Sequence, residues 1–185
     1  MSKRKLVLAS QSPRRREILA AAGFEFTVRV TPVPEVRAEG EAPEAYVRRL
    51  AREKAEASWV DGDEVVLGAD TVVVLGTDVL EKPGDVADAR RMLKLLSGRE
   101  HVVITGICLR HAGGSAVDAV STKVRFCALS DEEIESYANS GEPLDKAGAY
   151  AIQGLASKFV ESIDGCFFNV VGLPISRVYR YLQSL

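Results

Sequence analysis

The sequence is poor in the residues that most often build metal and redox centres. It contains three cysteines and two histidines among 185 residues. Cys108, Cys127 and Cys166 form no CxxC pair, which excludes a zinc ribbon and a thioredoxin-type motif. His101 and His111 lie too far from each other and from carboxylates to match a metal motif, and we interpret His101 as structural. Isolated cysteines suit a reducing compartment, so we expect a cytoplasmic protein.

Long apolar runs and a strong charge of one sign are also absent. No apolar run approaches the length of a membrane span, and the run at residues 6–9 is too short for a signal-peptide core. The net charge of −2 provides no global basic field for duplex nucleic acid. We therefore expect neither a membrane nor a nucleic acid as a partner. The hydrophobic content of 46% is that of an ordinary globular protein.

Three common catalytic signatures are missing as well. Neither the Walker A sequence GxxxxGK[ST] nor GxGxxG occurs, so a P-loop NTPase and a Rossmann protein lose their main support. No GxSxG occurs either, which makes Ser10 and Ser12 poor candidates for a hydrolase nucleophile. The function must therefore be argued from other polar residues.

Periodicity predicts strands and helices that mix throughout the chain without internal repeats. Strands are predicted at residues 6–9, 24–30, 101–109, 117–129 and 159–163, with a hairpin over 65–80. Helices are predicted at 13–22, 43–59, 86–96, 131–140 and 174–182, and Ser130 with Glu133 forms a capping box for the fourth. This pattern predicts an α/β protein with a mixed sheet, bordering on α+β. We expect a single domain over residues 1–185, with two lobes as the alternative.

The stretch LASQSPRRREIL, residues 8–19, places three arginines at the start of the first predicted helix. Ser12 occupies the N-cap position and Pro13 the first helical position, where free N–H groups attract an anion. Cations are disfavoured at this end of a helix, and a bound anion would remove that conflict. Successive helical side chains point about 100° apart, so at most one or two arginines can face one ligand, and we expect Arg16 on the surface. The alternative is an ordinary solvated helix start.

Asp70 is a carboxylate inside an apolar strand pattern. It shares one strand face with Val66, Gly68 and Val72. Because an isolated buried charge is costly, such a carboxylate must be paired, metal-bound or at the edge of a cleft. The alternative is an aspartate that caps a bulge at Gly68.

Two lysines and a glutamate add weaker signals. Lys54 falls on the apolar stripe of the second predicted helix, where most lysines extend to water. Lys82 ends a predicted strand, and Glu35 follows a proline-rich turn. Cations on several elements beside isolated carboxylates indicate a polyphosphate substrate with a divalent metal, since Arg and Lys hold phosphate and carboxylates hold a hard cation. The segment 141–154 is too long for a simple connector and is a further functional candidate.

Eight short motifs in a fixed order resemble the Maf family. Between residues 8 and 174 they are LASQSPRR, AREKA, GADT, EKP, SGREHVVITG, STKVRF, GEPLDKAGAYAIQG and NVVGLP. The resemblance implies a nucleoside triphosphate pyrophosphatase that cleaves between the α- and β-phosphates with Mg²⁺ or Mn²⁺. It also implies a fold like that of the inosine triphosphate pyrophosphatases, with an elongated, twisted mixed sheet, flanking helices and a central cleft.

The resemblance further implies roles for individual residues. Asp70 is the implied catalytic base and, with Glu35, an implied metal ligand. The implied substrate- and phosphate-binding residues are Ser12, Arg14, Arg15, Lys54 and Lys82.

Two motifs are similar to those of a subgroup that acts on dTTP and UTP. These are the threonine of GADT and the sequence IQG, and the resemblance links Arg14, Thr71 and Gln153 to substrate choice. A glutamine amide presents a donor and an acceptor together, which suits the N3–H and carbonyl edge of uracil or thymine. The alternative for Gln153 is a loop residue bonded to its own backbone. Modified pyrimidine nucleotides and a homodimer are options that the sequence leaves open.

Two other functions also stay open. Family names refer to septum formation and cell division, so a nucleotide-sensing regulatory protein that binds without hydrolysis is the main alternative. A nucleic-acid binder that uses Arg14, Arg15 and Arg16 is the second, and the lack of interleaved aromatic residues argues against it.

Overall fold

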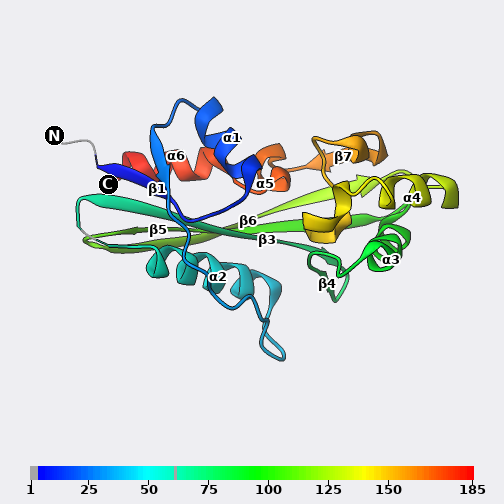
Figure 1. Ribbon diagram of the computed structural model, residues 1–185, viewed down its shortest axis with the longest axis horizontal. Coiled ribbons are helices and arrows are strands. Elements are labelled where there is room, and N and C mark those ends of the chain that lie inside the picture. The colour runs from blue at the N-terminus through cyan, green and yellow to red at the C-terminus, as the bar shows by residue number, and fades with distance from the viewer. Residues whose placement is uncertain (1–3, 61) are drawn as a thin grey trace. The chain divides into compact units, whose positions relative to one another are not determined.

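A mixed seven-stranded sheet forms the centre of the fold in the computed structural model, which describes residues 4–60 and 62–185 (Figure 1). Its strands are β1 Lys5–Leu8, β2 Phe26–Val28, β3 Glu64–Leu75, β4 Asp78–Leu80, β5 Glu100–His111, β6 Gly114–Phe126 and β7 Val160–Asp164. They follow the order β2-β1-β3-β5-β6-β7, with β4 paired to β3. β1 is parallel to β2 and β3, whereas β4 is antiparallel to β3 and β7 is antiparallel to β6. The predicted α/β class with a mixed sheet is confirmed.

The helices connect these strands. They are α1 Pro13–Ala21, α2 Pro43–Ala57, α3 Val86–Leu96, α4 Asp131–Ala138, α5 Phe167–Val171 and α6 Ile175–Gln183, with 3-10 helices η1 Glu142–Asp145, η2 Ala147–Ala149 and η3 Leu155–Phe159. Within the described parts of the chain, no helix combines the length and the apolar character needed to cross a bilayer.

Each predicted strand and helix has an observed counterpart, but several ends differ. The strand predicted from residue 24 begins only at Phe26, because Phe24 N donates to Leu19 O over 3.1 Å and so closes the end of α1. α5 and the three 3-10 helices were not predicted from the sequence. Two of these, η1 and η2, lie within the 141–154 segment, which is therefore more ordered than its turn-rich composition indicates.

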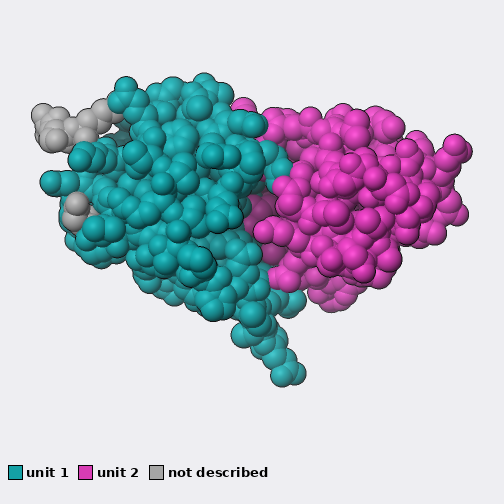
Figure 2. Space-filling view, viewed as in Figure 1, with its two compact units in different colours: residues 1–70, 105–120, 172–185 teal, residues 71–104, 121–171 magenta. Residues whose placement is uncertain are grey.

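The chain divides into two compact units (Figure 2). Unit 1 comprises Met1–Asp70, Thr105–Val120 and Gly172–Leu185, and unit 2 comprises Thr71–Ile104 and Ser121–Val171. The expectation of a single domain over residues 1–185 stays a prediction.

In unit 1, α2 packs on one face of the sheet, with α1 and α6 on the opposite face (Figure 1). The predicted apolar stripe of α2 is buried, including Val47, Leu50 and Ala51. A Cβ added to Gly68 would lie 2.1 Å from Ala51 O, and one added to Gly106 would lie 2.2 Å from Val47 O. The helix backbone therefore rests directly on glycine positions of β3 and β5. Gly68 serves this close contact, and the Asp70 carboxylate accepts a hydrogen bond from Lys54, so the alternative of Asp70 as the cap of a bulge at Gly68 is wrong.

The start of α1 follows the prediction in position. Pro13 begins the helix and Ser12 stands at the N-cap, although its side chain makes no capping hydrogen bond. Ile18 and Leu19 bury the inner face of the helix, and Arg16 is exposed, as predicted.

Unit 2 is organised around an aromatic cluster. His101, Phe126 and Tyr150 pack edge to face, with ring centroids 4.8 to 5.4 Å apart. His101 Nε2 lies 2.9 Å from Tyr150 Oη, so the structural interpretation of this histidine is confirmed. The capping box of α4 is also present, since Ser130 and Glu133 exchange both hydrogen bonds.

Candidate active site

Three predicted site residues meet in unit 1. Lys54 Nζ lies 2.7 Å from Asp70 Oδ1 and 2.6 Å from Glu35 Oε1. The Lys54 and Asp70 side chains are only 13% and 12% exposed, whereas Glu35 is 45% exposed. We call these three residues the acid–lysine cluster. Asp70 is thus a paired carboxylate in a buried strand, one of the possibilities that its sequence position predicted.

The geometry of α2 and β3 explains how the cluster forms. Gly68 and Asp70 lie on the same face of β3, two residues apart. Because α2 touches the sheet at Gly68, Lys54 in the last turn of the helix is brought beside Asp70. The interpretation of Lys54 as a lysine that merely extends to water is therefore wrong.

Opposing forces act on the Asp70 carboxyl group. Burial raises its pKa most strongly, while the charge and hydrogen bond of Lys54 and the charge of Arg15 lower it. The net effect is a pKa above the ordinary value for aspartate. A buried carboxylate with a raised pKa is a better proton acceptor than a solvated one.

Arg15 reaches from α1 to several backbone segments of unit 1. Its Nη1 donates to Ala69 O over 2.9 Å, directly before Asp70, and to Ser10 Oγ over 3.0 Å. Its Nε donates to Gly172 O over 2.8 Å. These contacts hold the strand end that carries Asp70. Binding of phosphate by Arg15 stays a prediction beside this observed role.

Ser10 has a structural role that the sequence did not predict. It is buried, and its Oγ also accepts a hydrogen bond from Ser12 N over 3.2 Å. Ser10 therefore links Arg15 to the start of α1. The available signal was a polar residue two positions after the buried strand β1, where packing favours apolar side chains.

The remaining predicted residues of unit 1 lie at the start of α1. Ser12 and Arg14 are both half-buried there, beside the first backbone N–H groups of the helix. The first turn contains no acidic side chain, so its charge suits an anion.

A divalent metal fits the donor set of the acid–lysine cluster. Asp70 Oδ1 and Glu35 Oε1 both contact the Lys54 ammonium, so the two carboxylates lie close to each other. Among the described residues, no group of three or more His, Cys, Asp or Glu side chains is placed to hold a metal ion. Mg²⁺ is commonly bound through only one or two carboxylates, with substrate phosphates and waters completing the shell, so two carboxylates are sufficient.

The other predicted residues belong to unit 2. Thr71 is half-buried in β3, Lys82 is exposed after β4, and Gln153 is exposed in the segment before η3. The segment that carries Gln153 is tied to the strand connection before Lys82, because Gly148 N donates to Glu81 O over 3.0 Å.

Comparison with known proteins identifies the family. The Maf-like protein family matches residues 5–185 of this chain. The chain belongs to the Maf-like protein family. The resemblance inferred from the eight motifs is therefore confirmed, and it extends over nearly all of this Maf-like protein.

Curated relatives match this Maf-like protein over nearly their full length. Proteins named dTTP/UTP pyrophosphatase from Koribacter versatilis and Vibrio cholerae are 51% and 52% identical, covering 96% and 97% of this chain and 93% and 97% of the relative. A protein of the same name from Anaeromyxobacter dehalogenans is 54% identical over 97% of this chain and 93% of its own.

A solved structure is also similar to part of this Maf-like protein. It is a nucleoside-triphosphatase, dITP/XTP pyrophosphatase, from Mycobacterium abscessus, 14% identical with a TM-score of 0.41 over 68% of this chain and 75% of the other. A similarity at this level carries no argument about the site.

Proposed function

We propose that this Maf-like protein hydrolyses dTTP and UTP to the nucleoside monophosphate and pyrophosphate. The relatives that bear the name dTTP/UTP pyrophosphatase support this proposal, since they are 51–54% identical over nearly the whole chain. The observation that carries the chemistry is the contact between the buried Asp70 carboxylate and the Lys54 ammonium in the acid–lysine cluster. It provides a proton acceptor next to a cation, as water attack on a phosphate requires.

In this proposal Asp70 accepts the proton of the water that attacks the α-phosphorus. Its raised pKa favours proton uptake, and Arg15 holds the preceding carbonyl of Ala69, which fixes the strand end. Pyrophosphate then leaves, and the positive charges of Lys54 and Lys82 stabilise the charge that develops on it.

The triphosphate is bound by groups at the start of α1. Ser12, Arg14 and Arg15 bind phosphate oxygens together with the helix N-terminus. Asp70 and Glu35 would hold a divalent metal, Mg²⁺ or Mn²⁺, and the bound ion would supply positive charge for the triphosphate. Lys54, which contacts both carboxylates, holds them in place for that metal.

Substrate choice rests on Arg14, Thr71 and Gln153. The Gln153 amide donates to one atom and accepts from another, which matches the N3–H and carbonyl edge of uracil and thymine. We place this activity in the cytoplasm, in agreement with the three free cysteines.

A nucleotide panel tests the proposal directly. The protein is incubated with dTTP, UTP, CTP and GTP with Mg²⁺ or Mn²⁺, and both products are identified. We expect pyrophosphate and the monophosphate from dTTP and UTP. Release of orthophosphate and a diphosphate would contradict attack at the α-phosphorus.

The same panel distinguishes the proposed pyrophosphatase from the main alternative function. A nucleotide-sensing regulatory protein of cell division would be stabilised thermally by nucleotides yet release no pyrophosphate. That outcome would replace the enzymatic proposal.

A further inference from the structure

Gln153 lies in a tight turn whose first residue is held by a tyrosine. Gly154 N donates to Ala151 O over 3.0 Å, which closes the turn. Ala151 N donates to Tyr137 Oη over 3.1 Å in a buried contact. Tyr137 is only 4% exposed, and its ring packs edge to face on Phe159 with centroids 5.4 Å apart. The beginning of the turn is therefore bound to a rigid side chain.

Glu142 holds the end of the same turn. Its Oε1 accepts a hydrogen bond from Tyr137 Oη over 2.9 Å, and its Oε2 accepts one from Leu155 N over 3.1 Å. A Cβ added to Gly154 would lie 2.3 Å from Glu142 Oε1, so a side chain there would displace this carboxylate from the turn. We call Tyr137 and Glu142 the turn clamp. The clamp binds the backbone on both sides of Gln153.

Charges around the turn favour a neutral ligand group over a phosphate. The Glu142 carboxylate lies at the end of the turn, and Gln153 itself is exposed and uncharged. The nearby cation Lys146 is already engaged, because its Nζ donates to Glu142 O over 3.0 Å and contacts the Asp145 carboxylate. Negative phosphate oxygens would be repelled here, whereas a neutral base edge would not.

We propose that Tyr137 and Glu142 are positioning residues that fix the Gln153 amide for the edge of a uracil or thymine base. This inference rests on the proposed function, in which Gln153 contacts the base. A base edge requires the donor and acceptor of the amide in one order, and a loose turn presents them in many orientations. A turn that is ordered before binding loses less conformational entropy when the nucleotide binds. The clamp therefore contributes to selectivity between bases.

The test compares dTTP with CTP in purified full-length variants. Cytosine carries an acceptor and an amino group where thymine carries N3–H and a carbonyl, so the ratio of the two kcat/KM values reports base recognition. We expect Tyr137→Phe to lower the dTTP/CTP ratio about tenfold, mainly through a higher KM for dTTP, because it removes the hydrogen bonds of Tyr137 Oη with Ala151 N and Glu142 Oε1. Gln153→Ala should lower the dTTP/CTP ratio similarly. The double variant with Tyr137→Phe and Gln153→Ala should lower the ratio no further, because both substitutions act through the same amide.

Tyr181→Phe is the matched control. It also removes a phenol that donates to a carboxylate, Asp118 Oδ2 over 3.1 Å, but in unit 1. We expect it to leave the dTTP/CTP ratio unchanged. If Tyr137→Phe does not fold, Glu142→Gln carries the same test, because it keeps the shape of Glu142 and weakens both of its hydrogen bonds.

Three results would overturn the inference. In the first, clamp variants that fold lower both kcat/KM values equally, which is the signature of a purely structural role. In the second, Gln153→Ala changes the ratio while the clamp variants do not. In the third, Gln153→Ala leaves the ratio unchanged although the wild type hydrolyses dTTP. Failure of the proposed function looks different, since the wild type then releases no pyrophosphate from any nucleotide, and the inference falls with it.

Discussion

At the scale of single residues, Asp70 is distinguished by the forces that act on its carboxylate. Burial raises its pKa, while Lys54 and Arg15 oppose that shift. The side chain therefore stays in hydrogen-bond contact with a cation while it is largely shielded from water. This combination favours proton transfer and differs from that of the surface carboxylates of the chain.

The substitution Asp70→Asn tests this role. It keeps the shape of the side chain and an oxygen that can accept from Lys54, so we expect the fold to persist. Loss of the proton acceptor should lower pyrophosphate release from dTTP by about 10²- to 10⁴-fold. Asp131→Asn is the control, because Asp131 also contacts a lysine, Lys94 at 2.8 Å, but on the surface. Near-normal turnover of folded Asp70→Asn would show that another group accepts the proton.

At the scale of elements, the close contact between α2 and β3 decides whether the cluster forms. The contact requires glycine at residue 68, since a Cβ there would lie 2.1 Å from Ala51 O and 2.8 Å from Ala55 N. Both neighbours are backbone atoms, which cannot rotate away as the end of a side chain can. The helix would have to move, and Lys54 would move with it.

We therefore expect Gly68→Ala to destabilise the protein and reduce turnover together. Overpacking in a core costs typically 1–3 kcal/mol, and a backbone neighbour places the cost at about 3 kcal/mol. Denaturant unfolding and pyrophosphate release measure the two effects. Gly84→Ala is the matched control, because a Cβ there meets nothing within 4 Å. Equal stability of the two variants would contradict the close contact.

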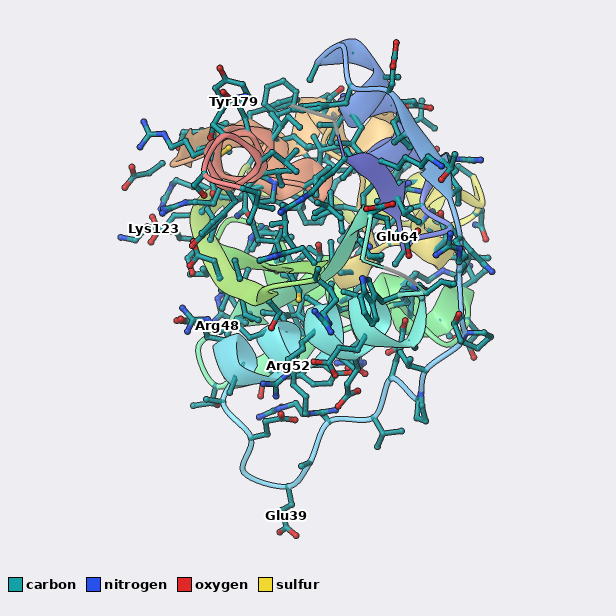
Figure 3. The ribbon with its side chains drawn as sticks, turned by 90° about the vertical axis from the view of Figure 1, so that its left-hand side faces the viewer. Glu39, Arg48, Arg52, Glu64, Lys123 and Tyr179 are labelled. Carbon is teal, nitrogen blue, oxygen red and sulfur yellow. The ribbon has the colours of Figure 1, made fainter. Side chains whose placement is uncertain are left out.

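The loop that carries Glu35 is held to α2 by Arg49. Arg49 of α2 donates from Nε and Nη2 to the two Glu41 carboxylate oxygens, each over 2.8 Å, and from Nη2 to Val36 O over 3.0 Å. The Arg49 hydrogen bond lowers the pKa of Glu41 to about 2. Figure 3 shows this loop extending from α2, with Glu39 near its tip. Arg49 thus ties the loop to the helix that carries Lys54.

Arg49→Ala should loosen the loop with little effect on the core. We expect faster amide hydrogen exchange at Ala38, whose N–H donates to Glu41 Oε2 over 3.1 Å. Turnover should fall several-fold, because Glu35 is less often in place. Arg52→Ala removes an exposed arginine of the same helix and should change neither measurement. Unchanged exchange in Arg49→Ala would show that the loop is held by other contacts.

At the scale of the whole molecule, the lowered pKa of the buried His101 makes the stability of the fold depend on pH. Burial lowers its pKa from 6.5 to about 4, so the unfolded chain takes up this proton at higher pH than the folded protein. The neutral His101 side chain contributes about 3 kcal/mol to the free energy of unfolding. This contribution is fully present above pH 6.5 and is lost as the pH falls towards 4. The pKa values of Glu41 and Glu133 are lowered from the ordinary 4.5, so their contributions to the stability of the fold are lost only below that pH.

Unfolding in denaturant between pH 6.5 and 4.5 measures this dependence. His101→Gln should be less stable at neutral pH but show a flatter dependence in that range, because no buried imidazole remains to be protonated. His111→Gln is the comparison, since His111 also has a lowered pKa but is less buried. The same slope in wild type and His101→Gln would assign the acid sensitivity to other groups.

Local features of the fold were predictable from the sequence. Pro13 marked the start of α1, Ser130 and Glu133 marked that of α4, and alternating apolar residues marked the strands, because these signals act within a few residues. The family motifs also indicated the candidate site residues, whose roles stay predictions. The role of Ser10 was not predicted, since its oxygen acts by joining Arg15 to Ser12 N.

The sequence by itself determined the order of elements, the mixed α/β class and the family, since periodicity, caps and ordered motifs are properties of a single chain. Tertiary structure alone decided that Lys54 contacts Asp70 and Glu35, and that Tyr137 and Glu142 hold the turn at Gln153. The physical reason is that these partners are distant in the chain or lie in different elements. They meet only in the folded chain, where the backbone of α2 packs on Gly68 of β3 and the Glu142 carboxylate lies against Gly154.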